Sequence, residues 1–170
     1  MEQTTTDVAN EAINPGSAAE DQLQLVTFEV NGEEFAVDIL AVQEINRMLD
    51  LTRVPQSPPE IEGVINLRGR IIPVMDLRTR FNMPPAERDD NNRIVVVEIR
   101  GRVIGFVVDK VHEVLRISSS IVDTAPDMVT SVDTDFIDGV GKLEDRLLIL
   151  LNLGRMISAE DLEAISAAAA

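Results

Sequence analysis

The amino-acid sequence predicts an all-β protein with short helices, built from two small five-stranded β-barrels that share a core. Three observations support this fold class. A long apolar segment occurs twice, a strand–turn–strand pattern also occurs twice, and both repeats keep the same order along the chain. We therefore interpret the sequence as an internal duplication, in which each copy supplies one barrel.

The repeated apolar segment is sharp in its first copy and degenerate in its second. Residues 63–77 read GVINLRGRIIPVMDL, and residues 139–153 read GVGKLEDRLLILLNL. Both copies have Gly-Val at the start, a central Leu, an Arg and a closing Leu at the same places. They diverge at one polar dipeptide, where Arg68-Gly69 becomes Glu144-Asp145. A duplicated framework that changes one polar dipeptide indicates that function lies near it.

The strand–turn–strand patterns precede these segments in both copies. Residues 25–30 alternate in polarity, Asn31-Gly32 supplies a tight turn, and residues 34–39 form the return strand. Residues 94–99, 100–101 and 103–108 repeat this arrangement. A further strand follows each hairpin, with the sequence VQEI at 42–45 and VHEV at 111–114. Each unit thus offers about five short strands, which suffice for a small barrel without exposed edges.

We predict the following boundaries. Residues 1–21 are acidic and lack periodicity, so they form a disordered tail, and the folded domain covers residues 22–165 with a hinge between the two units near 80–92. Local helices are predicted at 58–61 and 76–81. A C-terminal helix should begin with Ser158 as N-cap and place Leu162 and Ile165 on one face. The last residues, 166–170, form a frayed tail.

Composition excludes several classes of function. The net charge of −15 argues against binding to nucleic acid or to an anionic membrane surface, because both need clustered Lys and Arg. The absence of cysteine fits a reducing compartment. The sequence contains no long apolar run and no signal-peptide pattern, which predicts a soluble cytoplasmic protein without membrane insertion. With aromatic residues at only 3%, the core should be aliphatic.

The sequence shows no catalytic, cofactor or metal site. It lacks the glycine-rich phosphate loops and the nucleophile elbow, and its single histidine, His112, fits the exposed face of a strand. The acidic run 133–138 could be imagined as a calcium loop, but it lacks the EF-hand spacing, so a solvated loop is the better interpretation. We therefore predict that the protein is not an enzyme. The alternative is a small acid-dependent hydrolase that uses Asp76 and Glu44.

Two polar residues stand out once catalysis is set aside. Glu44 interrupts an apolar strand, and Arg68 precedes a turn, so the two could form an Arg–carboxylate ion pair if their strands are neighbours. Loss of one partner would cost about 3–5 kcal/mol if the pair is buried and less than about 1 kcal/mol if it is exposed. The equivalent positions of the second copy are Glu113 and Glu144, so we expect the ion pair in the first unit only.

At these residues the chain resembles the CheW-like domain family, the coupling proteins of bacterial chemotaxis. The matching motifs extend over residues 23–165. They are, with x for unmatched positions, DILxVQEI at 38–45, GVxNLRGxIxPxxDLR at 63–78, GxVVDxV at 105–111 and GxG at 139–141. The segment centred on Asn66-Leu67-Arg68-Gly69 is the most specific of them, and Asn66 and Gly69 support the motif around Arg68.

The resemblance implies two SH3-like barrels and an adaptor without enzymatic activity or cofactor. Such proteins join the cytoplasmic tips of chemoreceptors to the regulatory domain of the histidine kinase CheA, and they are recruited from the cytoplasm to membrane receptor arrays. By match to family positions, Val42, Gly63 and Val114 would contribute to a receptor-binding groove, with Glu44 and Arg68 as an ion pair near it. The alternative is a CheW-like scaffold that serves a different receptor–kinase pathway.

Overall fold

A computed structural model describes residues 22–55, 57, 60–123, 132–157 and 160–163 of the chain. Its secondary structure is mostly β, as predicted, with a few short helical turns. The strands are β1 (Gln22–Val30), β2 (Glu33–Asp38), β3 (Val42–Arg47), β4 (Ile61–Leu67), β5 (Arg70–Asp76), β6 (Arg93–Ile99), β7 (Arg102–Val108), β8 (Lys110–Ser118), β9 (Val122–Asp123), β10 (Ile137–Lys142) and β11 (Leu147–Leu151). The helical elements are η1 (Ile39–Ala41), α3 (Leu77–Arg80), η2 (Ser119–Ile121), η3 (Thr134–Phe136) and α4 (Leu153–Met156).

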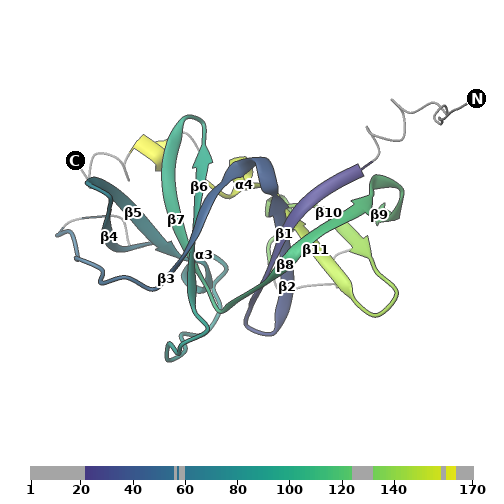
Figure 1. Cartoon of the computed structure of the whole chain (residues 1–170), viewed down its shortest axis with the longest axis horizontal. Coiled ribbons are helices and arrows are strands. Elements are labelled where there is room, and N and C mark those ends of the chain that lie inside the picture. Colours follow the sequence, from purple (N-terminus) through teal and green to yellow (C-terminus); the bar gives the residue numbers. More distant parts are fainter. Residues whose placement is uncertain (1–21, 56, 58–59, 124–131, 158–159, 164–170) are drawn as a thin grey trace, which may run out of the picture.

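The strands form two sheets, which lie side by side as two lobes in Figure 1. Lobe one is the five-stranded sheet with the order β3-β6-β7-β5-β4, and lobe two is the six-stranded sheet with the order β8-β1-β2-β11-β10-β9. Each sheet has two edge strands, so within the described residues the backbone hydrogen bonds of neither sheet close it into a complete barrel. The two-lobed, SH3-like architecture is therefore confirmed, but the two sheets are not fully closed barrels.

The strands are allocated to the lobes differently from the sequence-based prediction. Lobe one contains β3 to β7, and lobe two combines the N-terminal hairpin β1–β2 with β8 to β11. The two copies have thus exchanged hairpins: β2 pairs in parallel with β11, and β7 pairs in parallel with β5. Alternating polarity and a turn predict that a hairpin forms, but they do not specify which sheet it joins. Residues 81–92 consequently connect α3 to β6 within lobe one.

The duplication itself is visible in the strand register. The β4–β5 ladder shifts between Ile61 and Gly63, and the β10–β11 ladder shifts at the equivalent place, between Ile137 and Gly139. The β3–β6 and β1–β8 ladders share a shift in the same way. Because a bulge changes which side chains face the core, its appearance at equivalent places shows that both lobes share one framework.

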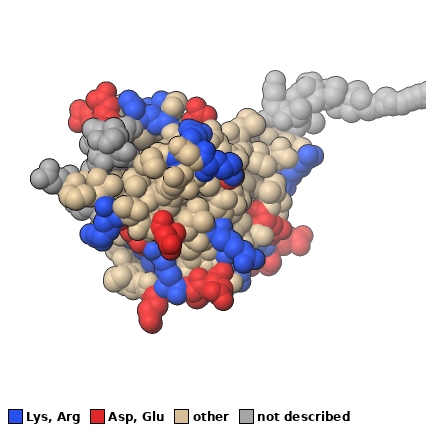
Figure 2. Space-filling view, turned by 60° about the vertical axis from the view of Figure 1, so that its left-hand side comes forward, with Lys and Arg blue, Asp and Glu red and all other residues tan. Residues whose placement is uncertain are grey.

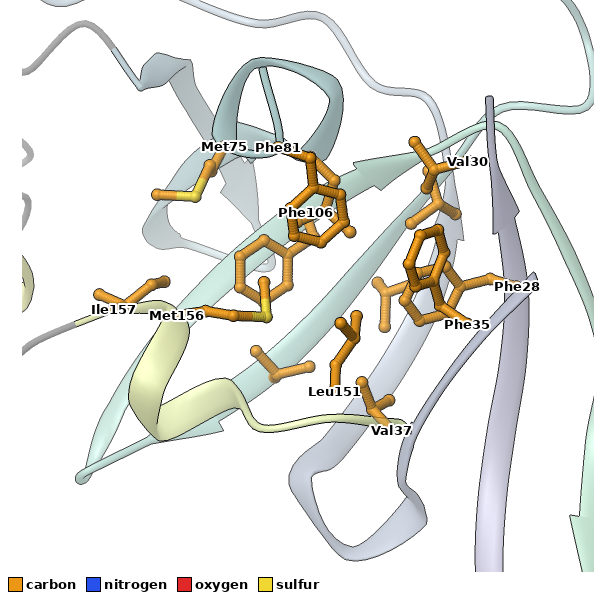
Figure 3. Packing of buried hydrophobic residues seen from close by; sticks show 14 of the residues in the cluster. Phe28, Val30, Phe35, Val37, Met75, Phe81, Phe106, Leu151, Met156 and Ile157 are labelled. Atoms are coloured by element: carbon orange, nitrogen blue, oxygen red, sulfur yellow. The ribbon is translucent and has the colours of Figure 1, made fainter. Parts of the chain in front are cut away.

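One hydrophobic cluster spans both lobes and lies between them. Figure 3 shows Phe28 and Phe35 of lobe two packed toward Phe81, Phe106 and Met156. The ring centroids of Phe35 and Phe81 are 5.3 Å apart. Two smaller clusters, one inside each lobe, are wholly aliphatic. The core is thus aliphatic as expected, except that the inter-lobe cluster gathers the chain's few phenylalanines at its centre.

The predicted short helices are partly confirmed. Residues 76–81 contain α3, whose N-cap Asp76 accepts a hydrogen bond from the backbone N–H of Arg78. Residues 160–163 are helical and Leu162 is buried, as the C-terminal prediction required. The proposed N-cap Ser158 lies outside the described residues, as do Ile165, Pro58, Pro59 and both predicted tails.

Candidate functional site: the junction between the lobes

The predicted contact between Glu44 and Arg68 is present in lobe one. Arg68 Nη2 donates to Glu44 Oε2, and this ion pair connects edge strand β3 to the β4–β5 turn. Arg68 and Gly69 both have positive φ, at 53° and 85°, and the Asn66 side chain accepts a hydrogen bond of 2.9 Å from the backbone N–H of Gly69. The turn therefore presents the arginine toward the strand on the opposite edge of the sheet.

The ion pair is exposed, which decides between the two energies considered above. The Arg68 side chain is 71% exposed and the Glu44 side chain is 26% exposed. Solvent screens such a pair, so its contribution to stability is at most about 1 kcal/mol. The guanidinium of Arg68 has five N–H donors and uses one of them in the hydrogen bond to Glu44. Because the Arg68 side chain is mostly exposed, the guanidinium is accessible to another protein. This geometry suits recognition better than stabilisation.

The expectation of an ion pair in the first unit only is wrong. In lobe two, Arg146 Nη2 lies 3.1 Å from Glu113 Oε2, and Glu113 is the equivalent of Glu44. Arg146 Nε also donates to Glu34 Oε1 at 2.7 Å. This hydrogen bond is the main cause that raises the pKa of Arg146 above its usual value. Sequence alignment of the copies pointed to Glu144, whereas the arginine at the other end of the same turn makes the contact.

We expect the two arginines to differ in their effect on stability. Arg146→Ala should lower the free energy of unfolding by about 1–3 kcal/mol, because it removes the recorded partner of the largely buried Glu34 carboxylate. Arg68→Ala is the matched control and should cost less than about 1 kcal/mol. Urea denaturation of both variants measures this difference, and equal losses would contradict it.

The three residues predicted to form a groove lie on both lobes. Val42 is half-buried on β3, and Gly63 is buried on β4, both in lobe one. Val114 lies on β8 of lobe two and is 54% exposed. The backbone packing explains why residue 63 is a glycine, because a Cβ atom there would lie 2.7 Å from the backbone oxygen of Thr52. The structure thus brings Val42 and Val114 to the junction, but it assigns Gly63 to close backbone packing.

Apolar side chains are exposed around the junction between the lobes. Val114 pairs across strands with Val26, and Ile45 pairs with Val95, and both of these partners are buried members of the inter-lobe cluster. The turn η1, which passes from lobe two to lobe one beside β1 and β6, adds Leu40 at 90% exposure. We call this set the junction surface; it comprises Leu40, Val42, Ile45 and Val114.

Two members of the junction surface, Val42 and Val114, are among the residues predicted for a groove, whereas Leu40 and Ile45 are not. Leu40 and Ile45 are ordinary apolar residues in a strand-rich sequence, and nothing in their spacing distinguishes them from core residues. In the structure, burial alternates along β3, and Ile45 falls on the exposed side. Exposed apolar residues that cluster beside a core mark interaction sites more often than isolated ones do.

The polar groups singled out as catalytic or metal candidates have structural roles. Asp76 caps α3 and also lies 3.1 Å from Arg88 Nη2, while Glu44 is engaged by Arg68. Asp133 caps η3, and Asp138 accepts from Asn152. His112 Nε2 lies 3.2 Å from Glu29 Oε1 on an exposed strand. Among the residues that the structure describes, no three potential metal ligands are grouped together.

The surface is mixed in charge despite the strong net negative charge of the chain. Figure 2 shows Lys and Arg interspersed with Asp and Glu around uncharged surface on the side where lobe one comes forward. Two cavities of about 390 and 450 Å³ are lined mainly by polar and charged residues, and neither includes Val42, Gly63 or Val114. Within the described part of the chain, no helix has the length and apolar character needed to cross a membrane.

Comparison with known proteins identifies the family. The model of the CheW-like domain matches residues 24–161 of the chain. The chain belongs to the CheW family. The chemotaxis protein CheW of Bacillus subtilis is 38% identical over 138 residues, which are 81% of this chain and 88% of that protein. CheW of Klebsiella aerogenes is 36% identical over 139 residues, which are 82% of this chain and 84% of that protein.

A solved structure agrees with the fold of this CheW-family chain. The crystal structure of the scaffolding protein TtCheW from Thermoanaerobacter tengcongensis aligns with a TM-score of 0.74 at 37% sequence identity. The alignment covers 82% of this chain and 90% of the TtCheW chain. The family resemblance found in the sequence therefore extends to the whole folded domain.

Proposed function

We propose that this chain is a non-enzymatic adaptor that couples chemoreceptor signalling tips to the regulatory domain of the histidine kinase CheA. Membership of the CheW family supports the adaptor role, and the structural use of the candidate acids argues against hydrolysis. In the cell, the protein would reside in the cytoplasm and be recruited to receptor arrays at the membrane. The observation that carries the proposal is the exposed apolar junction surface beside the inter-lobe core.

The junction surface suits a helical partner. Its members project from η1, from β3 in lobe one and from β8 in lobe two, so a partner that contacts all of them must lie across the junction. A receptor tip is an α-helical bundle, and an apolar stripe on a helix can bind to such a surface in the helix-in-groove mode. Arg68 could then bind a carboxylate of the partner, because its guanidinium is mostly exposed.

This proposal predicts that a charge placed on the junction surface weakens receptor binding. Val114→Asp should weaken binding of a receptor cytoplasmic fragment at least tenfold, because burying an uncompensated carboxylate at an interface costs more than about 1.4 kcal/mol. Isothermal titration calorimetry with the purified fragment measures this change. The variant should stay folded, since Val114 is half-exposed in the free protein.

Leu147→Asp is the matched control. Leu147 is similarly exposed on lobe two, but it lies at the start of β11 beside Arg146, outside the junction surface. We expect its affinity for the receptor fragment to equal that of the wild type. Equal affinities for wild type and Val114→Asp would overturn the assignment of the junction surface, and failure of the wild type to bind either the receptor fragment or CheA would overturn the adaptor function.

A further inference from the structure

Among the described strands, the chain crosses from one lobe to the other twice, and the two crossovers differ in chemistry. The first crossover is η1, between β2 of lobe two and β3 of lobe one. The second is Asp109, between β7 of lobe one and β8 of lobe two. In Figure 1 they lie at opposite edges of the junction, with η1 toward the top of the view and the β7–β8 crossover toward the bottom.

The crossover at Asp109 is held by an ion pair with lobe one and by a backbone hydrogen bond from lobe two. Arg78 of α3 donates to the Asp109 carboxylate through Nε at 3.1 Å and through Nη2 at 2.6 Å. The backbone N–H of Asn31, in the β1–β2 turn of lobe two, donates to the same carboxylate at 2.8 Å. The side chains of Arg78 and Asp109 are only 15% and 25% exposed. A bidentate, partly buried ion pair of this kind fixes geometry as well as charge.

Further bonds extend this arrangement. Arg78 Nη1 donates to the Pro84 carbonyl at 2.8 Å, and the backbone N–H of Asp109 donates to the Glu29 carbonyl at 3.0 Å. We call the set of Arg78, Asp109 and Asn31 the inter-lobe clasp. It joins α3 of lobe one, the crossover itself and the hairpin turn of lobe two at one point, so a change in the angle between the lobes would have to break or bend these bonds.

The η1 crossover is held differently. The positions equivalent to Asp109 and Arg78 in the other copy are Leu40 and Gly154, which cannot form an ion pair. The equivalent of Asn31 is Arg100, which donates to the Ile157 carbonyl at 2.8 Å. The recorded hydrogen bonds of η1 are local, from Leu40 N–H to Asp38 and from Val42 N–H to the Ile39 carbonyl. This side of the junction also carries the exposed Leu40.

We infer that the inter-lobe clasp fixes the relative orientation of the two lobes, and that it thereby positions the two halves of the junction surface for a partner. Arg78 and Asp109 are then positioning residues: they do not belong to the junction surface, but they hold its two halves in register. Without the clasp the lobes would sample more relative orientations, and only a fraction of them would match a rigid helical partner. Apparent affinity falls in proportion to that fraction.

The inter-lobe distance tests this inference without any partner. The chain has no cysteine, so Gln24→Cys on lobe two and Arg70→Cys on lobe one, both exposed, can carry spin labels for pulsed electron–electron distance measurement on the full chain. We expect a narrow distance distribution in the otherwise wild-type chain and a broader one with Arg78→Ala. Arg78→Lys, which keeps the charge but lacks the bidentate fork, should fall between them.

Arg88→Ala is the matched control for a merely structural effect. Arg88 also makes two ion-pair contacts, with Glu62 and Asp76, but all three residues belong to lobe one or to its 81–92 connection. Its removal should leave the distribution as narrow as in the wild type. Should Arg78→Ala fail to fold, Asp109→Asn in the same labelled chain takes its place, since it removes the charge without removing the side chain. Wild-type widths in the clasp variants would overturn the inference.

The consequence for binding rests on the adaptor function proposed above, and the two can fail separately. Titration with the receptor fragment should show about tenfold weaker binding for Arg78→Ala and wild-type binding for Arg88→Ala, a loss within the usual range of conformational coupling. If the wild type binds no receptor fragment but the distances broaden, the adaptor function is refuted and the clasp stands. If the wild type binds and the distances do not change, the clasp is refuted and the adaptor function stands.

Discussion

Phe35→Ala should destabilise the whole domain by about 3–5 kcal/mol, the usual cost of removing a fully buried aromatic side chain. Phe35 is completely buried on β2, its ring lies 6.1 Å from that of Phe28 on the same lobe, and it lies 5.3 Å from that of Phe81 on the other lobe. The variant would therefore leave a cavity at the centre of the inter-lobe cluster (Figure 3). Neither lobe can fill this cavity without moving relative to the other.

Urea denaturation followed by circular dichroism measures this loss. We expect a single transition in the wild type, because the shared cluster couples the unfolding of the two lobes. Leu147→Ala is the control, since that side chain is half-exposed and its truncation should cost less than about 1 kcal/mol. Two separate transitions in the wild type, or a loss below about 1 kcal/mol for Phe35→Ala, would contradict the view that one core unites the lobes.

Gly63→Ala should also have a large effect, a loss of about 1–3 kcal/mol in the free energy of unfolding through overpacking. The added Cβ would lie 2.7 Å from the Thr52 carbonyl oxygen. Thr52 cannot simply move away, because its backbone exchanges two hydrogen bonds with Val64, at 2.9 and 2.8 Å. The substitution should therefore break this isolated bridge and displace the segment before β4.

Gly141→Ala is the matched control for Gly63→Ala. The nearest atoms to its added Cβ are side-chain carbons at 3.4 Å or more, which is ordinary contact. We expect Gly141→Ala to cost less than about 1 kcal/mol, and hydrogen exchange to show faster exchange of the Val64 amide in Gly63→Ala only. Unchanged protection of that amide would contradict the packing role of Gly63 and favour a direct role in partner binding.

The family, the β-rich fold and the duplication could be predicted from the sequence because they depend on local patterns. Alternating polarity and Asn-Gly or Arg-Gly turns specify hairpins wherever they occur, and both predicted turns have the required positive φ at Asn31 and Arg100. The contact between Glu44 and Arg68 was also predictable. Their strands belong to one copy and could lie close together in a barrel, and the equivalent positions had diverged in the second copy.

Contacts that depend on longer-range pairing could not be predicted in this way. The ion pair of lobe two uses Arg146, which aligns with Arg70 and not with Arg68, because a flexible arginine at either end of the turn can reach the opposite strand. The role of Gly63 was also hidden, since glycine in a strand indicates close approach without saying what approaches. The exposure of Leu40 became apparent only from the three-dimensional structure.

The amino-acid sequence alone determined that this protein is a duplicated, aliphatic β-domain of the CheW family whose distinctive polar dipeptide is Arg68-Gly69. The three-dimensional arrangement decided that the copies exchange hairpins, that one core unites two lobes, and that Asp109 and η1 form unlike crossovers between them. The physical reason lies in the range of the interactions. Turn and strand patterns act between neighbours in the chain, whereas the parallel pairing of β2 with β11 and the contact of Arg78 with Asp109 join residues far apart.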